Sequence, residues 1–432
     1  MHFPGHLFYP WPFCVVASWR LGSGRSVSLW LMLIMSFPWI PYAAAQPAQD
    51  SAFSPPPYLW GLIGNDGQHL VEEREAGIEA KLLSLSWRQW FRVPGVTNTT
   101  YVERKRAELM QLRQAGFSII LSLGYHDTPP WVHELYPSSR YLNQYGEAYD
   151  GAGEIDSGDA NLVFNAALRE LVALYVENVF TTLGTDFVAV RVGGGRWGEL
   201  TYPPAAHGLH TNAYWAFDAN AQAQSPVPGW VPGMASPGGE ARRFLEWYLQ
   251  TLVDYQSWQI ATVARHFSGA IMVLYPGWGI RPGRIEQALA TDLAGSAVAE
   301  RSGEIAQGRD FARQIAAITR SNVIVTTTWL EADPSRDDGT DQRYWSSIKY
   351  LAQLVAIHPL RLRLYAENSG QDDAAAMELA ARQVQRYGMI GMAWYREDEL
   401  FSGQYATLDH YRQAIRTILP PRVVFLPLVR GR

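Results

Sequence analysis

Residues 187–199 read Phe-Val-Ala-Val-Arg-Val-Gly-Gly-Gly-Arg-Trp-Gly-Glu. A short run of apolar and β-branched residues is typical of a buried strand, and three consecutive glycines let the chain turn sharply behind it. Segments with helical periodicity flank this run at 162–182 and 240–267. The segment therefore predicts one strand of a parallel β–α unit, which ends in a glycine turn followed by a glutamate.

Seven further runs of the same kind occur along the chain. They span 58–64, 78–86, 117–123, 270–275, 323–328, 362–365 and 389–394. Further helix-period segments lie between them, at 102–115, 304–319, 341–357 and 372–387. Eight strands that alternate with helices predict an α/β fold, a (β/α)8 TIM barrel that forms a single domain over 58–418. An open doubly wound sheet is the alternative, because the number of strands alone does not prove closure.

Two long insertions follow predicted strands three and four, at 125–161 and 200–239. Both leave the carboxyl ends of their strands, which is the face where barrel enzymes build their active sites. Long loops at this face are often functional, although an insertion that is merely tolerated is the alternative. We therefore expect the functional site at this end of the barrel.

The N-terminal residues 1–45 resemble an export signal. Basic residues precede an apolar run at 28–37, and Ala43-Ala44-Ala45 offers a small-residue cleavage site. An uncleaved anchor or a misplaced start codon are the alternatives. The Pro-rich segment 46–57 predicts an extended linker, and the short apolar tail 419–432 is too short to span a bilayer. We expect a secreted protein without a stable membrane span after cleavage.

Composition excludes several classes of protein. Removal of the signal leaves 34 basic and 41 acidic residues, a net charge of −7, which argues against a nucleic-acid partner. Cys14 is the only cysteine and lies in the signal, so the mature chain has no disulfide, thiol nucleophile or cysteine metal site. We expect no cofactor and no metal. His126-Asp127 lacks a second histidine at helical spacing, and the acidic loop 150–159 lacks the alternating acids of an EF-hand.

Glutamates stand at the ends of two predicted strands. Glu199 follows strand four after the glycine turn, and Glu367 ends strand seven in Leu362-Arg-Leu-Tyr-Ala-Glu-Asn368. Each alone is readily explained by a structural ion pair. Together they place two carboxyl groups at the same end of the barrel, and hydrolysis of a glycosidic bond requires two such groups on either side of the bond.

The motifs around these residues resemble two families of barrel glycoside hydrolases. Leu85-Ser-Trp-Arg-Gln-Trp90 and Leu121-Ser-Leu-Gly-Tyr-His-Asp-Thr-Pro-Pro-Trp-Val132 are similar to strands two and three of family-42 β-galactosidases. Gly198-Glu-Leu-Thr-Tyr-Pro203 and Ala366-Glu-Asn368 are similar to the Gly-Glu-Leu-Arg-Tyr-Pro and Gly-Glu-Asn motifs of β-amylases. The resemblance spans about residues 58–400. It implies that Glu199 is the acid and Glu367 the nucleophile or base.

The two resemblances imply different stereochemistry. β-Amylase-like strands imply inversion, with Glu367 activating water, whereas family-42-like strands imply retention, with Glu367 as nucleophile. Family-42 enzymes carry Asn before the strand-four acid, and this chain has Gly198 there, which puts retaining β-galactosidase chemistry in doubt. An arginine beside the strand-seven carboxylate suits an ionised nucleophile, and we favour retention by a small margin.

Residues at other strand ends are candidates for contacts with the substrate. Tryptophan rings stack on sugar faces, although each tryptophan taken singly is more often part of a core. We expect Arg88 to hydrogen-bond the strand-seven carboxylate and keep it ionised, with Tyr275 as a second partner. The substrate-binding candidates are Arg88, Tyr125, Asp127, Trp131, Trp197, Tyr275, Trp329 and Trp394.

These features predict a secreted glycoside hydrolase, β-galactosidase-like, that acts on an oligo- or polysaccharide. A β-amylase-like inverting glucan hydrolase is the first alternative. A catalytically silent carbohydrate-binding barrel is the second, because a fold does not fix a function. A barrel enzyme of another class, such as a lyase or isomerase, is the third.

Overall fold

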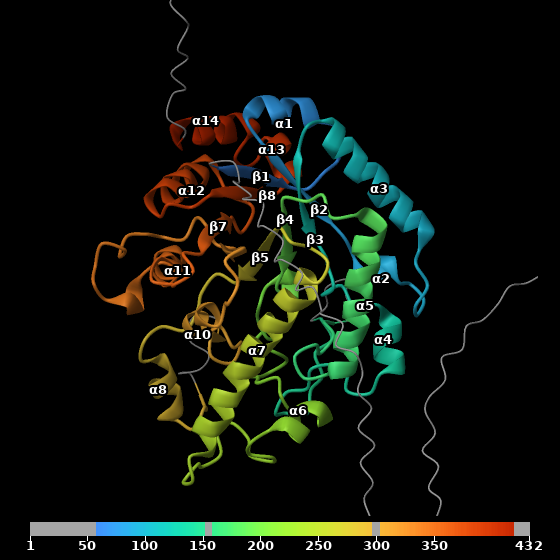
Figure 1. The fold of residues 1–432 in the computed structure, drawn as a ribbon. Helices are drawn as coiled ribbons and strands as arrows, with labels where there is room; N and C mark the ends of the chain where they lie inside the picture. Colours follow the sequence, from blue (N-terminus) through green and yellow to red (C-terminus); the bar gives the residue numbers. More distant parts are fainter. Residues whose placement is uncertain (1–57, 152–157, 296–302, 419–432) are drawn as a thin grey trace, which may run out of the picture. The chain divides into compact units, whose positions relative to one another are not determined.

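The computed structural model describes residues 58–151, 158–295 and 303–418, so the predicted signal, linker and tail lie outside the described residues. Eight parallel strands form a closed barrel in the order β1 to β8, and β1 pairs with β8 (Figure 1). The strands are β1 (Leu59–Ile63), β2 (Ala80–Ser84), β3 (Ser118–Ser122), β4 (Ala189–Val192), β5 (Ala270–Tyr275), β6 (Val323–Thr327), β7 (Arg363–Glu367) and β8 (Gly391–Tyr395). The predicted (β/α)8 barrel is confirmed, and the open sheet is excluded.

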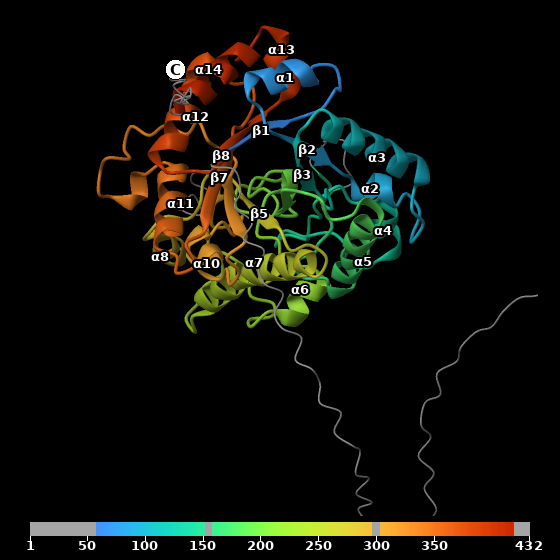
Figure 2. The same cartoon turned by 45° about the horizontal axis from the view of Figure 1, so that its top comes forward.

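Helices surround the strands on the outside (Figure 2). The larger ones are α3 (Thr99–Gln114), α5 (Ala166–Leu183), α7 (Glu240–Ala264), α11 (Ser347–Ala356), α12 (Ala374–Arg386) and α14 (Leu408–Ile418). The shorter ones are α1 (Leu70–Ala76), α2 (Trp87–Trp90), α4 (Pro130–Leu135), α6 (Ala219–Gln224), α8 (Arg284–Leu289), α10 (Phe311–Ala316) and α13 (Glu397–Ser402). No helix within these described ranges is long and apolar enough to cross a membrane.

Two predicted helices are shorter than the periodicity suggested. The segment 304–319 forms only α10, because Gly308 has a positive φ of 69° and Asp310 caps a new helix by accepting from the backbone N–H of Arg313. The segment 341–357 forms α11 after a second cap, in which Ser346 accepts from the backbone N–H of Lys349. In both segments a capping residue inside the predicted range sets the start of the helix, so the helix begins several residues after the predicted start.

Strand side chains alternate between the inside of the barrel and the layer beneath the helices, as the strand period of two requires. The interior is filled by apolar residues, which are Leu59, Ala80, Leu82, Ile120, Ala189, Ala270, Met272, Leu274, Ile324, Tyr365 and Ala393. Alternate residues such as Val190, Val273 and Leu364 join the larger core under the helices. This alternation decides which side chains at the strand ends face the opening of the barrel.

The two predicted insertions pack on each other beside the barrel. The backbone N–H of Phe217 donates to Leu142 O over 2.9 Å, and Asn161 donates to the buried carboxylate of Asp218 over 2.8 Å. Tyr202 at the start of the second insertion is fully buried against α7. The described parts of the two insertions therefore form one packed lobe beside the barrel.

Candidate active site

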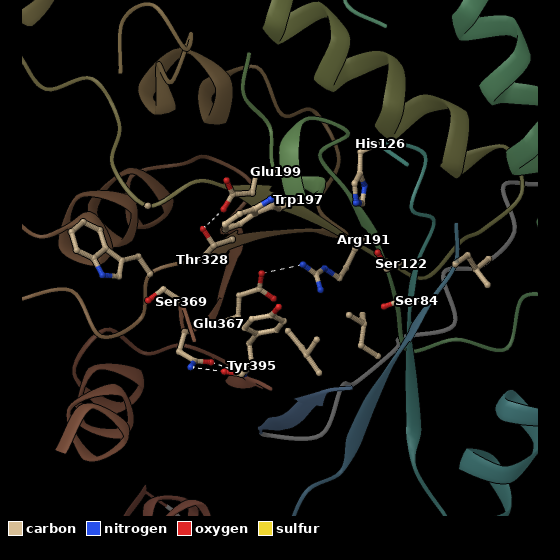
Figure 3. Close-up of a pocket in the computed structure, with 16 residues that line it drawn as sticks. Ser84, Ser122, His126, Arg191, Trp197, Glu199, Thr328, Glu367, Ser369 and Tyr395 are labelled. Carbon is tan, nitrogen blue, oxygen red and sulfur yellow. Dashed lines mark hydrogen bonds and ion pairs between the residues drawn. The ribbon is translucent and has the colours of Figure 1, made fainter. Parts of the chain in front are cut away.

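A cavity of about 680 Å³ opens at the carboxyl ends of the strands, a size typical of ligand sites. Its walls come from all eight strands or the loops that follow them. The lining residues are Ile63, Leu82, Ser84, Leu85, Ser122, His126, Arg191, Trp197, Glu199, Gly277, Thr328, Trp329, Glu367, Asn368, Ser369 and Tyr395 (Figure 3). Both predicted glutamates lie in this cavity.

Glu199 is placed by the glycine turn after β4. A Cβ atom at Gly193 would collide with the carbonyl oxygen of Gly198, so the loop closes this tightly only with glycine. The backbone N–H of Gly195 donates to Glu199 O over 2.8 Å, and the N–H of Leu200 donates to Leu274 O at the end of β5. These bonds fix the backbone on both sides of Glu199. Its carboxylate accepts a hydrogen bond of 2.5 Å from Thr328 Oγ1.

Glu367 is the last residue of β7 and points into the barrel in phase with Tyr365. Its side chain is buried, with 9% of the residue exposed. Arg191, which points inward from β4, donates from Nη2 to Glu367 Oε1 over 3.0 Å. A buried carboxylate needs such a partner, because an uncompensated charge at this depth is costly.

The two carboxyl groups have different electrostatic surroundings. Burial raises the pKa of Glu199, and the largest opposing influence is the charge of the half-buried Arg309, which donates to Thr201 Oγ1 over 3.2 Å. Burial also raises the pKa of Glu367, but Arg191 opposes it directly through charge and a hydrogen bond. Glu199 therefore suits the protonated form, and Glu367 is the carboxylate with a cation bonded to it. Such a division is what acid and nucleophile or base pairs require.

A polar wall lies on the Arg191 side of the cavity. It consists of Ser84, Ser122 and His126, from the ends of β2 and β3. Burial, with a contribution from the charge of Arg191, lowers the pKa of His126 to about 4. The imidazole is therefore neutral at neutral pH and can both donate to and accept from hydroxyl groups. Neither His126, considered from the sequence only as a metal ligand, nor Arg191 was among the predicted substrate-binding residues, and both lie in the cavity.

Three aromatic side chains also line the cavity: Trp197, Trp329 and Tyr395. The sequence selected the first two, but on β8 it selected Trp394. Trp394 is 1% exposed and points away from the cavity toward Tyr411, with ring centroids 6.3 Å apart. The alternation on β8 puts Ala393 and Tyr395 inside, so Tyr395 takes the place expected for Trp394.

Arg88 does not hold the place that the sequence suggested. Its Nε lies 3.3 Å from Asp127 Oδ1, and Asp127 also accepts from Ser86 Oγ. Neither Arg88 nor Asp127 is among the residues that line the cavity. The arginine bonded to Glu367 is Arg191, which corrects the prediction. Arg88 belongs to α2, outside the ring of strands, whereas Arg191 projects from a strand into the barrel.

Three further candidates are also outside the cavity lining. Trp131 is buried and donates from Nε1 to Phe91 O over 2.7 Å. Tyr125 is buried and donates to Gln259. Tyr275 faces the helix layer and donates to Gln256 Oε1 over 2.7 Å, so it is not the second partner of Glu367 that we expected. All three have their polar atoms bonded within the core.

Among the described residues, no group of three or more His, Cys, Asp and Glu side chains is arranged to hold a metal ion.

The Arg191–Glu367 pair makes a prediction about pH dependence. Arg191→Met removes the cation beside Glu367, so the pKa of Glu367 should rise further and the carboxylate should ionise only at higher pH. The acidic limb of the pH profile of kcat/KM should move to higher pH by about one unit or more. Arg88→Met is the matched control, because its guanidinium pairs with Asp127, and it should leave this limb in place. A shifted limb in the control with an unchanged limb in Arg191→Met would contradict the assignment.

No protein-family model and no curated protein matches the sequence. Solved structures do share its fold. The catalytic domain of the β-amylase from Paenibacillus polymyxa superposes with a TM-score of 0.65 and 16% identity, over 84% of this chain and 99% of that chain.

Two β-galactosidases superpose less closely. The enzyme from the haloarchaeon Halorubrum lacusprofundi has a TM-score of 0.54 and 13% identity, over 84% of this chain and 58% of its own. A catalytic mutant of a family-42 enzyme from G. stearothermophilus has a TM-score of 0.53 and 10% identity, over 84% of this chain and 57% of its own. This chain therefore spans a little over half of their length. The resemblance seen in the sequence motifs recurs in three dimensions: this chain has the barrel fold of β-amylase and the family-42 β-galactosidases.

Proposed function

We propose that the protein is a glycoside hydrolase in which Glu199 is the general acid and Glu367 is the second carboxylate. One observation carries the proposal: two glutamates, one from the loop after β4 and one from the end of β7, line one cavity, where Glu367 is ion-paired with Arg191 and Glu199 accepts a hydrogen bond from Thr328. This arrangement supplies a proton donor and an anion on two sides of the same space, which is what cleavage of a glycosidic bond needs.

The proposed reaction begins with proton transfer from Glu199 to the oxygen of the leaving group. The bond between that oxygen and the anomeric carbon breaks, and positive charge develops on the sugar. The Glu367 carboxylate stabilises this charge, and Arg191 holds it in place. Thr328 donates to the Glu199 carboxylate after the proton has left, which stabilises the anion and prepares Glu199 to accept a proton from water.

Two substitutions test the pair. Glu199→Gln and Glu367→Gln should each lower kcat by at least about 10²–10⁴-fold, because each removes a group that acts on the reacting bond. Glu199→Gln should lose far less with a dinitrophenyl glycoside, whose leaving group needs no proton, whereas Glu367→Gln should be slow on every substrate. Glu286→Gln is the control, because Glu286 is an exposed glutamate that pairs with Arg242 and is outside the cavity lining. Activity near that of the wild type in either test variant would remove that residue from the mechanism.

A barrel that only binds carbohydrate would give a different result. The wild-type protein would then bind oligosaccharides but release no reducing ends. A lyase would release unsaturated products. Both outcomes contradict the proposed hydrolysis.

We favour retention, in which Glu367 bonds to the anomeric carbon as the leaving group departs, and water, whose proton passes to Glu199, then displaces Glu367 in a second step. The direct ion pair with Arg191 supports this, because a nucleophile works as an ionised carboxylate and must leave again as one. An anomeric NMR time course on the first-formed product should show the configuration of the substrate retained. An inverted product would instead make Glu367 the base that activates water, as in the β-amylase-like alternative.

We also propose that the enzyme acts outside the cytoplasm, on the basis of the N-terminal sequence alone. N-terminal sequencing of the exported protein should begin near Gln46, because Ala43-Ala44-Ala45 precedes it. Membrane-bound protein that retains Met1 would indicate an anchor instead.

A further inference from the structure

Trp197 has an unusual conformation for a bulky residue. Its backbone lies in the left-handed region, with φ 59° and ψ 18°, which is strained for any residue with a Cβ atom. Its side chain is nevertheless 66% exposed and lines the cavity. A strained backbone that presents a large apolar ring to solvent gains little for folding, so the conformation calls for a functional reason.

Neighbouring contacts hold the Trp197 ring at the mouth of the cavity. The backbone N–H of Gly198 donates to Gly195 O over 2.8 Å, which closes the short 3-10 turn around Trp197. The guanidinium of Arg196 lies 4.9 Å from the indole centroid and limits the orientations of the ring. The turn therefore presents the indole two residues before the proposed acid, Glu199.

Trp329 is the second exposed indole of the cavity. It is 37% exposed and directly follows Thr328, whose hydroxyl is bonded to Glu199. A Cβ atom at Gly277 would lie 3.1 Å from Trp329 Cε3, so the indole rests closely on the backbone after β5. Both tryptophans therefore lie on segments that also hold or contact the proposed acid.

The cavity has two chemically different ends. Figure 3 shows Trp197 beside Glu199. The hydroxyls of Ser84 and Ser122 lie on the opposite side, beyond Arg191 and Glu367. His126 lies close to the loop of Trp197, because a Cβ atom at Gly198 would be 3.4 Å from its Cε1. Hydroxyl groups suit the many hydroxyls of a sugar that is held on all sides, whereas indoles suit the flat apolar face of a ring.

From this arrangement we infer that Trp197 and Trp329 form the subsite for the leaving group, and that this subsite takes a sugar ring. The inference rests on the proposed function, because the general acid protonates the leaving-group oxygen and so marks the leaving-group side. The polar end holds the sugar whose anomeric bond is broken. The substrate class is then a di- or oligosaccharide, in preference to a glycoside of a small alkyl alcohol.

The test compares two kinds of substrate. The first is a panel of di- and trisaccharides of glucose and galactose. The second is the α- and β-glucosyl and galactosyl fluorides, whose leaving group is a single atom and cannot stack. Trp197→Gly and Trp329→Ala should lower kcat/KM about tenfold or more on the oligosaccharide that the wild type cleaves, and change it little on the fluoride of the same sugar.

Trp197→Gly also has a readout that does not depend on activity. Glycine adopts a positive φ without strain, so the Tm of this variant should equal or exceed that of the wild type while the oligosaccharide rate falls. Tyr344→Ala is the matched control, because Tyr344 is an exposed aromatic residue outside the cavity lining. This variant should leave kcat/KM unchanged on both kinds of substrate.

Equal losses on fluorides and oligosaccharides would overturn the inference, since the rings would then serve the sugar at the polar end or the fold. Unchanged rates on both substrates in both tryptophan variants would also overturn it. If the wild-type protein cleaves none of these substrates, the proposed function fails. In that case the affinity of the wild type and of Trp197→Gly for the trisaccharides is measured by calorimetry. Weaker binding by Trp197→Gly would uphold the sugar-ring subsite, and equal binding would refute it.

Discussion

Closure of eight parallel strands is the constraint on which the rest of this structure depends. Once β1 pairs with β8, every strand side chain must face either the interior of the barrel or the layer under the helices. The interior is apolar over most of its depth, so charged groups are tolerated only where the barrel opens. Glu367 and Arg191 stand at that point. Their ion pair across the barrel satisfies two inward charges that neither strand could bury alone.

The two carboxyl groups are held by different kinds of structure, and this explains their different surroundings. Glu367 belongs to a strand, so the ladder of β7 fixes its direction. Glu199 belongs to a tight loop, and its position depends on glycines and on backbone bonds to the end of β5. The loop brings Glu199 to the hydroxyl group of Thr328. Arg309, whose charge opposes the rise in the pKa of Glu199 most strongly, is bonded to Thr201, two residues further along the chain. A proton donor and a stabilised anion thus arise from one scaffold.

The division between strands and loops also separates two aspects of recognition. Ser84 and Ser122 of the polar wall are the last residues of β2 and β3, where the barrel dictates position, and His126 lies in the loop after β3. The exposed indoles come from the loops after β4 and β6, which can change without disturbing the core. Loops at this face are where barrel enzymes of one fold acquire different specificities.

The sequence by itself determined the eight strands that alternate with helices and the presence of Glu199 and Glu367 after strands four and seven, whereas the pairing of β1 with β8 decided that the barrel is closed. These follow from local signals, namely apolar runs, helical periodicity and glycines. It did not determine which neighbour of each strand end faces inward. Parallel strands are buried on both faces, so their runs lack the alternation that would have separated Trp394 from Tyr395 or revealed Arg191. Tertiary structure decided that, because the partner of Glu367 lies 176 residues away in the chain and meets it only across the closed barrel.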